Sequence, residues 1–205
     1  MEQSASRTIR RQPSVSTDAV LDTAERLLRK HGFDGISVRR IAEELGASRQ
    51  VVYTHFAGMN GLLDELHRRL SRRLIDAVDA VDAPGGTITH LVGAAAAYRA
   101  TARRWPELYQ LVFERPITDY EIGPAAVAEG VHSFEMIIDI AAQWLHITAG
   151  VADPSRRAAV DLARAMWSSL HGFVVLERVG FATPVDTDRL SEQSVVALLD
   201  GWSAS

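Results

Sequence analysis

Residues 37–56 read SVRRIAEELGASRQVVYTHF, a stretch that holds two short apolar segments on either side of Gly46. Ala42 is small enough for the second segment to pack against it, and Gly46 can take a positive φ without a Cβ penalty. Val52 is placed to anchor the second segment inward. Two short helices joined by such a turn form a helix-turn-helix, in which the second helix protrudes far enough to enter a DNA major groove. The stretch therefore predicts a nucleic-acid-binding head.

The outer side of the second segment carries side chains that suit base recognition. Arg49 can reach O6 and N7 of guanine, Gln50 can pair with adenine, and Val51 can touch a thymine methyl group. We predict that these three residues read bases, with Thr54 on the same outer side. Groups suited to phosphate surround them, either as side-chain donors or beside free amides of a helix N-terminus: Ser37, Arg39, Arg40, Ser48, Tyr53 and His55.

Apolar residues recur at helical spacing on both sides of this stretch, and no strand-like alternation appears. The sequence therefore predicts an all-α fold. The head should consist of a helix capped by Thr17 and ended by Gly32, one capped by Ser37, and one that Ser48 caps and that runs to about Phe56. A longer fourth helix should reach about Val81. Further helices are expected at Thr87–Arg104, Pro106–Phe113, Pro124–Thr148, Pro154–Val179 and Thr187–Trp202.

The composition of the 205 residues excludes several classes of protein. A hydrophobic content of 47% and a mean hydropathy of -0.02 fit a soluble globular chain, and no apolar run reaches about 18 residues. The polar, basic N-terminus argues against a secretory signal, so we expect a cytoplasmic protein with no membrane partner. The 0 cysteines exclude disulfides, thiolate metal sites and cysteine nucleophiles.

Charge is divided unevenly along the chain. Residues 1–73 contain 13 Lys and Arg against 9 Asp and Glu, a net +4, which leaves -8 for residues 74–205 out of the total of -4. A basic third joined to an acidic remainder suggests that one end meets a polyanion. Residues 1–16 are expected to form a flexible basic arm that carries Arg7, Arg10 and Arg11.

The stretch from Ala19 to Leu74 resembles the DNA-binding domain of the TetR family of transcriptional regulators, and the run from Val52 to Phe56 is its most specific part. The resemblance implies a three-helix head, a long fourth helix that leads to a helical ligand-binding domain, and a homodimer on a near-palindromic operator. By position it implies DNA contacts for Arg39, Arg49, Gln50, Val51, Tyr53 and His55. Its other matching residues are Leu21, Ala24, Leu27, Gly32, Ser37, Ile41, Ala42, Gly46, Ser48, Leu62 and Leu63.

One position departs from the family pattern: Met59 stands where the family usually has Lys, so one phosphate contact is missing. DNA affinity is then expected to depend more on the basic arm. The expected domains are the arm at 1–16, the DNA-binding domain with its linking helix at 17–82, and a ligand-binding and dimerisation domain at 83–205.

The second half holds a further resemblance. Residues 167–173, WSSLHGF, are similar to the Trp and His-Gly signature of the WHG-type ligand-binding domain found in some TetR-like regulators. The likeness implies a helix that lines the ligand pocket on one side and helps to form the dimer interface on the other.

Most aromatic residues of the C-terminal helices are expected to be ordinary core. A regulator also needs a cavity, and pockets are mostly apolar with a few polar groups. We predict that His171 is the polar group of the pocket that binds the ligand. The alternative is a core histidine bonded to a carbonyl group. The full predicted lining is Tyr98, Tyr109, Phe113, Met136, Trp167 and His171.

The last two expected helices each carry an apolar stripe, and two such helices from each subunit could form a four-helix dimer interface. Packing within one chain is the alternative for the same residues. The predicted interface comprises Leu170, Val174, Val175, Val195, Leu198, Leu199 and Trp202.

His132, Glu135 and Asp139 share one helix face, but no second ligand cluster completes a metal sphere, so a solvated polar face is the preferred interpretation. No phosphate loop or nucleophile elbow appears either, so we expect no metal, no cofactor and no enzyme.

The leading hypothesis is a homodimeric repressor that a small-molecule effector releases from a palindromic operator in double-stranded DNA. The alternative, suggested by Met59, is a helical small-molecule-binding or enzymatic domain whose helix-turn-helix is only a scaffold.

Overall fold

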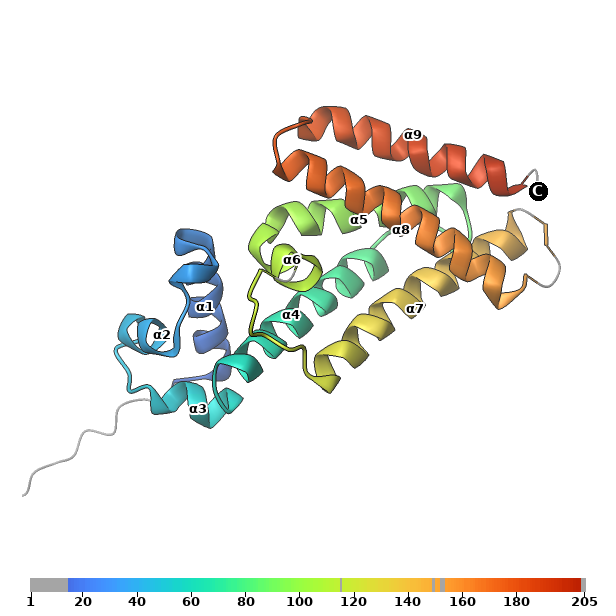
Figure 1. Cartoon of the computed structure of the whole chain (residues 1–205). Coiled ribbons are helices and arrows are strands. Elements are labelled where there is room, and N and C mark those ends of the chain that lie inside the picture. Colours follow the sequence, from blue (N-terminus) through green and yellow to red (C-terminus); the bar gives the residue numbers. More distant parts are fainter. Residues whose placement is uncertain (1–14, 115, 149, 152–153, 204–205) are drawn as a thin grey trace, which may run out of the picture. The chain divides into compact units, whose positions relative to one another are not determined.

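The structure is a computed structural model that describes residues 15–114, 116–148, 150–151 and 154–203. These residues form nine α-helices and one short 3-10 helix, with no strand among them (Figure 1). The all-α prediction is confirmed. The predicted arm residues Arg7, Arg10 and Arg11 lie outside the described residues.

The chain divides into two compact units, Met1–Leu62 and Leu63–Ser205. Helix α4, Met59–Asp79, crosses this division, so all but its first turn belongs to the second unit. The sequence had grouped the whole of this helix with the DNA-binding head.

The first unit contains α1 (Thr17–His31), the 3-10 helix η1 (Phe33–Gly35), α2 (Val38–Glu44) and α3 (Gln50–Phe56). The expected cap of α1 was wrong by one residue, because the Ser16 hydroxyl accepts from the Ala19 amide at 3.2 Å and Thr17 is already helical. Ser37 does cap α2, accepting from the Arg40 amide at 3.2 Å. Gly46 turns the chain between α2 and α3 with φ +60, as the sequence predicted.

The core of this unit follows the apolar periodicity of its helices. Each helix turns its stripe inward, and burial of one such side chain stabilises the fold by about 1.5–3 kcal/mol. The helix-turn-helix depends on this core because its two helices have only seven residues each and are too short to be stable alone. The buried apolar residues are Val20, Leu21, Ala24, Leu27, Leu28, Ile41, Ala42, Val52, Phe56 and Leu62.

The second unit contains α5 (Ile88–Arg104), α6 (Pro106–Phe113), α7 (Pro124–Ile147), α8 (Arg156–Arg178) and α9 (Pro184–Ser203). Helix α8 packs against α7 and α9, and α5 packs against α6, α7, α8 and α9. The predicted helices are all present, with ends that differ by up to three residues. Ser155 caps α8, accepting from the Ala158 amide at 3.2 Å, so α8 starts two residues after the expected Pro154.

A buried charge cluster joins α5 to α8 and α9. The Arg99 guanidinium, only 1% exposed, donates to the Glu177 carboxylate and to Ser191, and also to Thr187 at 2.8 Å. Asp188 of α9 lies 3.0 Å from the same guanidinium and 2.8 Å from that of Arg103. The cluster therefore bonds three helices through one buried cation.

Candidate DNA-binding surface and ligand cavity

Helix α3 has one buried and one exposed side. Val52 and Phe56, four residues apart, turn inward, with 0% and 8% of their surface exposed. On the outside lie Arg49, Gln50, Tyr53 and Thr54, all exposed, with Val51 half-buried beside them. The structure therefore brings the three predicted base-reading residues to one outward surface.

Helix α3 does not begin as the sequence suggested. Its N-cap residue is Arg49, which has helical φ and ψ and makes no side-chain capping bond, so the expectation that Ser48 caps the helix was wrong. The Ser48 carbonyl instead accepts from the Val51 amide at 3.1 Å, and the residue is exposed. The Ser48 side chain thus lies at the surface beside the predicted base-reading residues.

The two arginines of α2 have different surroundings. Arg39 is exposed and pairs with Glu43 at 3.2 Å, a surface ion pair of a kind that contributes little and exchanges easily. Arg40 is half-buried and donates to the Gly35 carbonyl at 2.9 Å, which ties α2 to η1. Of the two, Arg39 is therefore the better placed to contact a phosphate, while Arg40 supports the fold.

Both ring nitrogens of His55 are engaged within the first unit. Nδ1 lies 3.0 Å from the Thr17 hydroxyl and Nε2 lies 2.9 Å from the Val15 carbonyl. The last turn of α3 is thereby tied to the start of α1, so His55 has a positioning role besides its predicted DNA contact. Thr54 bonds its own helix, donating to the Gln50 carbonyl at 2.9 Å.

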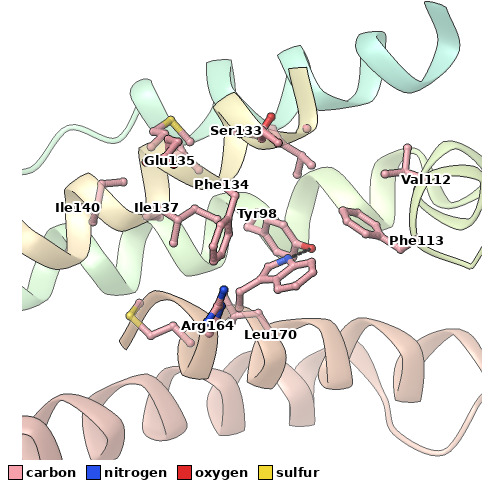
Figure 2. A pocket seen from close by; sticks show the side chains of 18 of the residues that line it. Tyr98, Val112, Phe113, Ser133, Phe134, Glu135, Ile137, Ile140, Arg164 and Leu170 are labelled. Carbon is pink, nitrogen blue, oxygen red and sulfur yellow. Dashed lines mark hydrogen bonds between the residues drawn. The ribbon is translucent and has the colours of Figure 1, made fainter. Parts of the chain in front are cut away.

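The second unit contains a cavity of about 610 Å³ that is partly open to solvent and is lined by α4, α5, α7 and α8 and by the end of α6 (Figure 2). Four of the six residues predicted to line a pocket do so: Tyr98, Phe113, Met136 and Trp167. Tyr109 and His171 are not in the lining and lie behind it: Tyr109 is hydrogen-bonded to Tyr98, and His171 is hydrogen-bonded to Tyr109. The prediction therefore found the aromatic wall of the cavity together with part of its support.

The sequence had not predicted the contribution of α4. His67, Leu74 and Val78 of this helix line the cavity, as do Ala94 and Ala95 of α5. An apolar stripe has the same pattern whether a core or a cavity covers it, so periodicity gave no signal for these residues. The one sequence signal for a cavity along α4 is His67, a polar residue within a leucine-rich stripe that is buried in the structure.

A chain of hydrogen bonds supports the aromatic wall. The Trp167 indole donates to the Tyr98 hydroxyl at 3.1 Å, this hydroxyl bonds that of Tyr109 at 2.8 Å, and Tyr109 bonds Nδ1 of His171 at 2.6 Å. Burial raises the pKa of Tyr98 to about 12 and lowers the pKa of His171 below its usual value. This series of hydrogen-bonded side chains therefore stays uncharged near neutral pH, and the bond that His171 makes through Nδ1 is to the Tyr109 hydroxyl.

The acidic face of α7 is partly occupied. Glu135 binds the Arg156 guanidinium with both carboxylate oxygens, at 2.7 and 2.6 Å. Among the described residues no group of three or more His, Asp and Glu side chains is arranged to hold a metal ion, His132 and Asp139 included. Glu135 is thus accounted for by a surface ion pair.

The predicted dimer residues divide into two sets. Leu170, Val174, Val195 and Leu199 have at most 6% of their surface exposed within the single chain, so they pack in its own core. Val175, Leu198 and Trp202 are half-buried and remain reachable by a partner. Packing within one chain therefore explains the first set, and a predicted interface would depend on the second.

None of the described helices is long and apolar enough to cross a membrane.

Two family models match the chain. Residues 20–66 match the model described as "Bacterial regulatory proteins, tetR family", and residues 91–198, more than half of the chain, match "Tetracyclin repressor-like, C-terminal domain". Neither description mentions the WHG type, so that part of the resemblance stays a prediction.

The similar proteins agree with these models. The chain is 24% identical over 197 residues, 96% of this chain and 86% of the other, to an uncharacterized HTH-type transcriptional regulator of Mycobacterium tuberculosis. It is 33% identical over 115 residues, 56% of this chain and 40% of the other, to the HTH-type transcriptional repressor DrrR1 of Streptomyces coeruleorubidus. A crystal structure of a candidate transcriptional regulator from Pseudomonas aeruginosa PAO1 matches with a TM-score of 0.69 and 25% identity, over 96% of this chain and 94% of that one. With its helix-turn-helix and its aromatic cavity, this chain belongs to the TetR family of ligand-responsive, DNA-binding transcriptional regulators.

Proposed function

We propose that the protein is a repressor that binds a palindromic operator as a homodimer and leaves it when a small-molecule effector enters the cavity. The observation that carries this proposal is the pairing of two sites in one chain. The first unit presents Arg49, Gln50 and Val51 on one outward surface, and the second contains a cavity of about 610 Å³ with mostly apolar walls. Because operator DNA would be its partner, we place the protein in the cytoplasm.

Helix α4 offers the mechanical link. It runs without a break from Met59 to Asp79, and its second half carries Leu74 and Val78 into the cavity lining. An effector that displaces these side chains acts on the helix whose first turn belongs to the DNA-binding unit. The two DNA-binding units of a dimer must reach half-sites about 34–36 Å apart. A small shift of α4 in each subunit changes the spacing of these units, so that they no longer fit successive major grooves.

The repressor role draws on DrrR1 of Streptomyces coeruleorubidus, which is named a transcriptional repressor. The homodimer draws on the half-buried apolar residues of α8 and α9, Val175, Leu198 and Trp202. Family membership disfavours the alternative in which the helix-turn-helix is only a scaffold, since that reading needs function to survive without DNA contacts.

Substitution of the base-reading residues tests the proposal. A bidentate arginine contact to guanine contributes about 1–3 kcal/mol of discrimination, so Arg49→Ala should weaken specific operator binding by about tenfold or more. Dimerisation and ligand binding should be unchanged, because Arg49 lies on the outer surface of the first unit. Arg29→Ala, at an exposed position of α1, is the matched control. Equal losses on operator and random DNA for Arg49→Ala would show that the residue does not read bases.

A further inference from the structure

The size of the cavity limits its occupant. An apolar cavity of about 150 Å³ accommodates one benzene molecule, so about 610 Å³ has room for roughly four ring-sized groups. This is the volume of a compact small molecule and falls in the usual range for ligand pockets.

The walls of the cavity are aromatic on several sides. Trp167 of α8 contacts Phe134 of α7 at 5.8 Å between ring centroids and Phe113 of α6 at 5.9 Å, with interplanar angles of 57° and 58°. Figure 2 shows Tyr98, Phe113 and Phe134 pointing into the same space. Ring faces and edges presented at such angles hold flat ligands by stacked and edge-to-face contacts, which aliphatic ligands of equal size cannot make.

Three of the charged or polar residues of the lining, Ser133, Glu135 and Arg164, are bonded within the protein or exposed to water. Glu135 is neutralised by Arg156, and the Ser133 hydroxyl donates to the Glu129 carbonyl at 2.9 Å. Arg164 is exposed, so its guanidinium group is in contact with water. A charge carried into the apolar interior would therefore lose its hydration without gaining a buried partner among these groups, which is costly.

Tyr98 lines the cavity, and its hydroxyl can act as a hydrogen-bond donor or acceptor. The Tyr98 hydroxyl accepts from the Trp167 indole, and its hydrogen either goes to Tyr109 or points away from it, according to which nitrogen of His171 carries the proton. In the first arrangement Tyr98 offers a ligand a lone pair, and in the second a hydrogen. The cavity can therefore accommodate one neutral donor or acceptor at this point.

We propose that the effector is an uncharged molecule of two to four fused or linked aromatic rings, with its rings against Trp167, Phe134 and Phe113 and one neutral polar group at Tyr98. The proposal rests on the regulatory function proposed above and specifies the chemical class of the ligand that this function requires.

A pair of fluorescent probes with one skeleton tests the charge. N-phenyl-1-naphthylamine is neutral, and 8-anilinonaphthalene-1-sulfonate adds only a sulfonate to it. With the full chain at neutral pH, the neutral probe should bind one per chain and at least about tenfold more tightly than the anionic one. Equal or tighter binding of the sulfonate, lost in Arg164→Gln, would overturn the proposal in favour of an anionic effector.

Displacement of the neutral probe tests the requirement for flat rings. Naphthalene and decalin both contain ten carbon atoms, and naphthalene should displace the probe at a concentration about three- to tenfold lower. Equal displacement by the two would refute an aromatic effector. This comparison needs only the unaltered protein, so it does not depend on whether a variant folds.

Matched phenylalanine variants locate the binding site. Phe134→Leu removes one aromatic wall and should weaken binding of the neutral probe by about three- to tenfold. Phe181→Leu alters a side chain that is 84% exposed and outside the cavity, so it should change binding less than twofold. The reverse order would place the probe on the surface and overturn the proposal. Failure of both probes to bind, in a protein that still selects a palindromic operator, would refute the ligand class and leave the regulatory function standing.

Discussion

Replacement of Glu177 by Gln should expose how much the second unit depends on its buried charge cluster. The Glu177 side chain is only 7% exposed, and its carboxylate pairs with the guanidinium of Arg99, whose side chain is 1% exposed. Removing one charge of a buried pair costs about 3–5 kcal/mol because the other is left without compensation. Asp188, 3.0 Å from Arg99 and 56% exposed, still offers a partly screened charge. We therefore expect the lower end, about 3 kcal/mol.

A loss of this size is large against a total stability of about 5–15 kcal/mol. It should lower Tm by about 6–12 °C for a unit of this size, and urea unfolding followed by circular dichroism measures the loss directly. Glu135→Gln is the control, because its ion pair with Arg156 is exposed to solvent and should contribute little to stability. If Glu177→Gln costs no more than Glu135→Gln, the cluster does not join α5 to α8 and α9 in the way described.

Three further predictions concern the backbone and the buried tyrosines. Ala57 ends α3 with φ +57, so Ala57→Gly should stabilise the fold by about 1 kcal/mol in urea unfolding, and a loss of stability would contradict the strain. A Cβ on Gly123 would lie 2.2 Å from Oδ2 of Asp64. Gly123→Ala should thus disturb the bonds that the Gly123 amide and Tyr120 hydroxyl donate to Asp64, at a cost of about 1–3 kcal/mol; an unchanged Tm would refute this. Burial raises the pKa of Tyr98 from 10.0 to about 12, so the unfolded chain loses this proton first and stability falls as pH rises from 10 to 12. Absorbance at 295 nm should then rise together with the loss of helical signal, and Tyr98→Phe should shift this transition.

Much of the fold could be predicted from the sequence because helices show their periodicity and their ends locally. Val52 was expected on the inner side of α3 and is fully buried there, and the glycine turn at Gly46 appeared where expected. Caps were less predictable. Ser16 and Thr17 are adjacent hydroxyl residues with similar capping ability, so only the actual backbone path selects Ser16.

The site was only partly predictable, since periodicity shows which side of a helix is apolar and not what covers it. Leu170 and Val174 were expected at a dimer interface, yet they are buried within the chain. Tyr109 and His171 were expected in the cavity lining and instead support it from behind. Such outcomes depend on contacts between residues of different helices, here 62 and 69 positions apart in the chain, which local patterns do not encode.

The central claim is that α3 reads a specific operator, and selection of bound sequences from random duplex DNA tests it most directly. The selection should be run with the unaltered protein at two salt concentrations and read by sequencing. The account predicts a palindromic motif whose half-sites lie about 34–36 Å apart and which persists at the higher salt concentration. Binding that enriches no motif and disappears as salt rises would mean phosphate attraction alone, and would contradict the account.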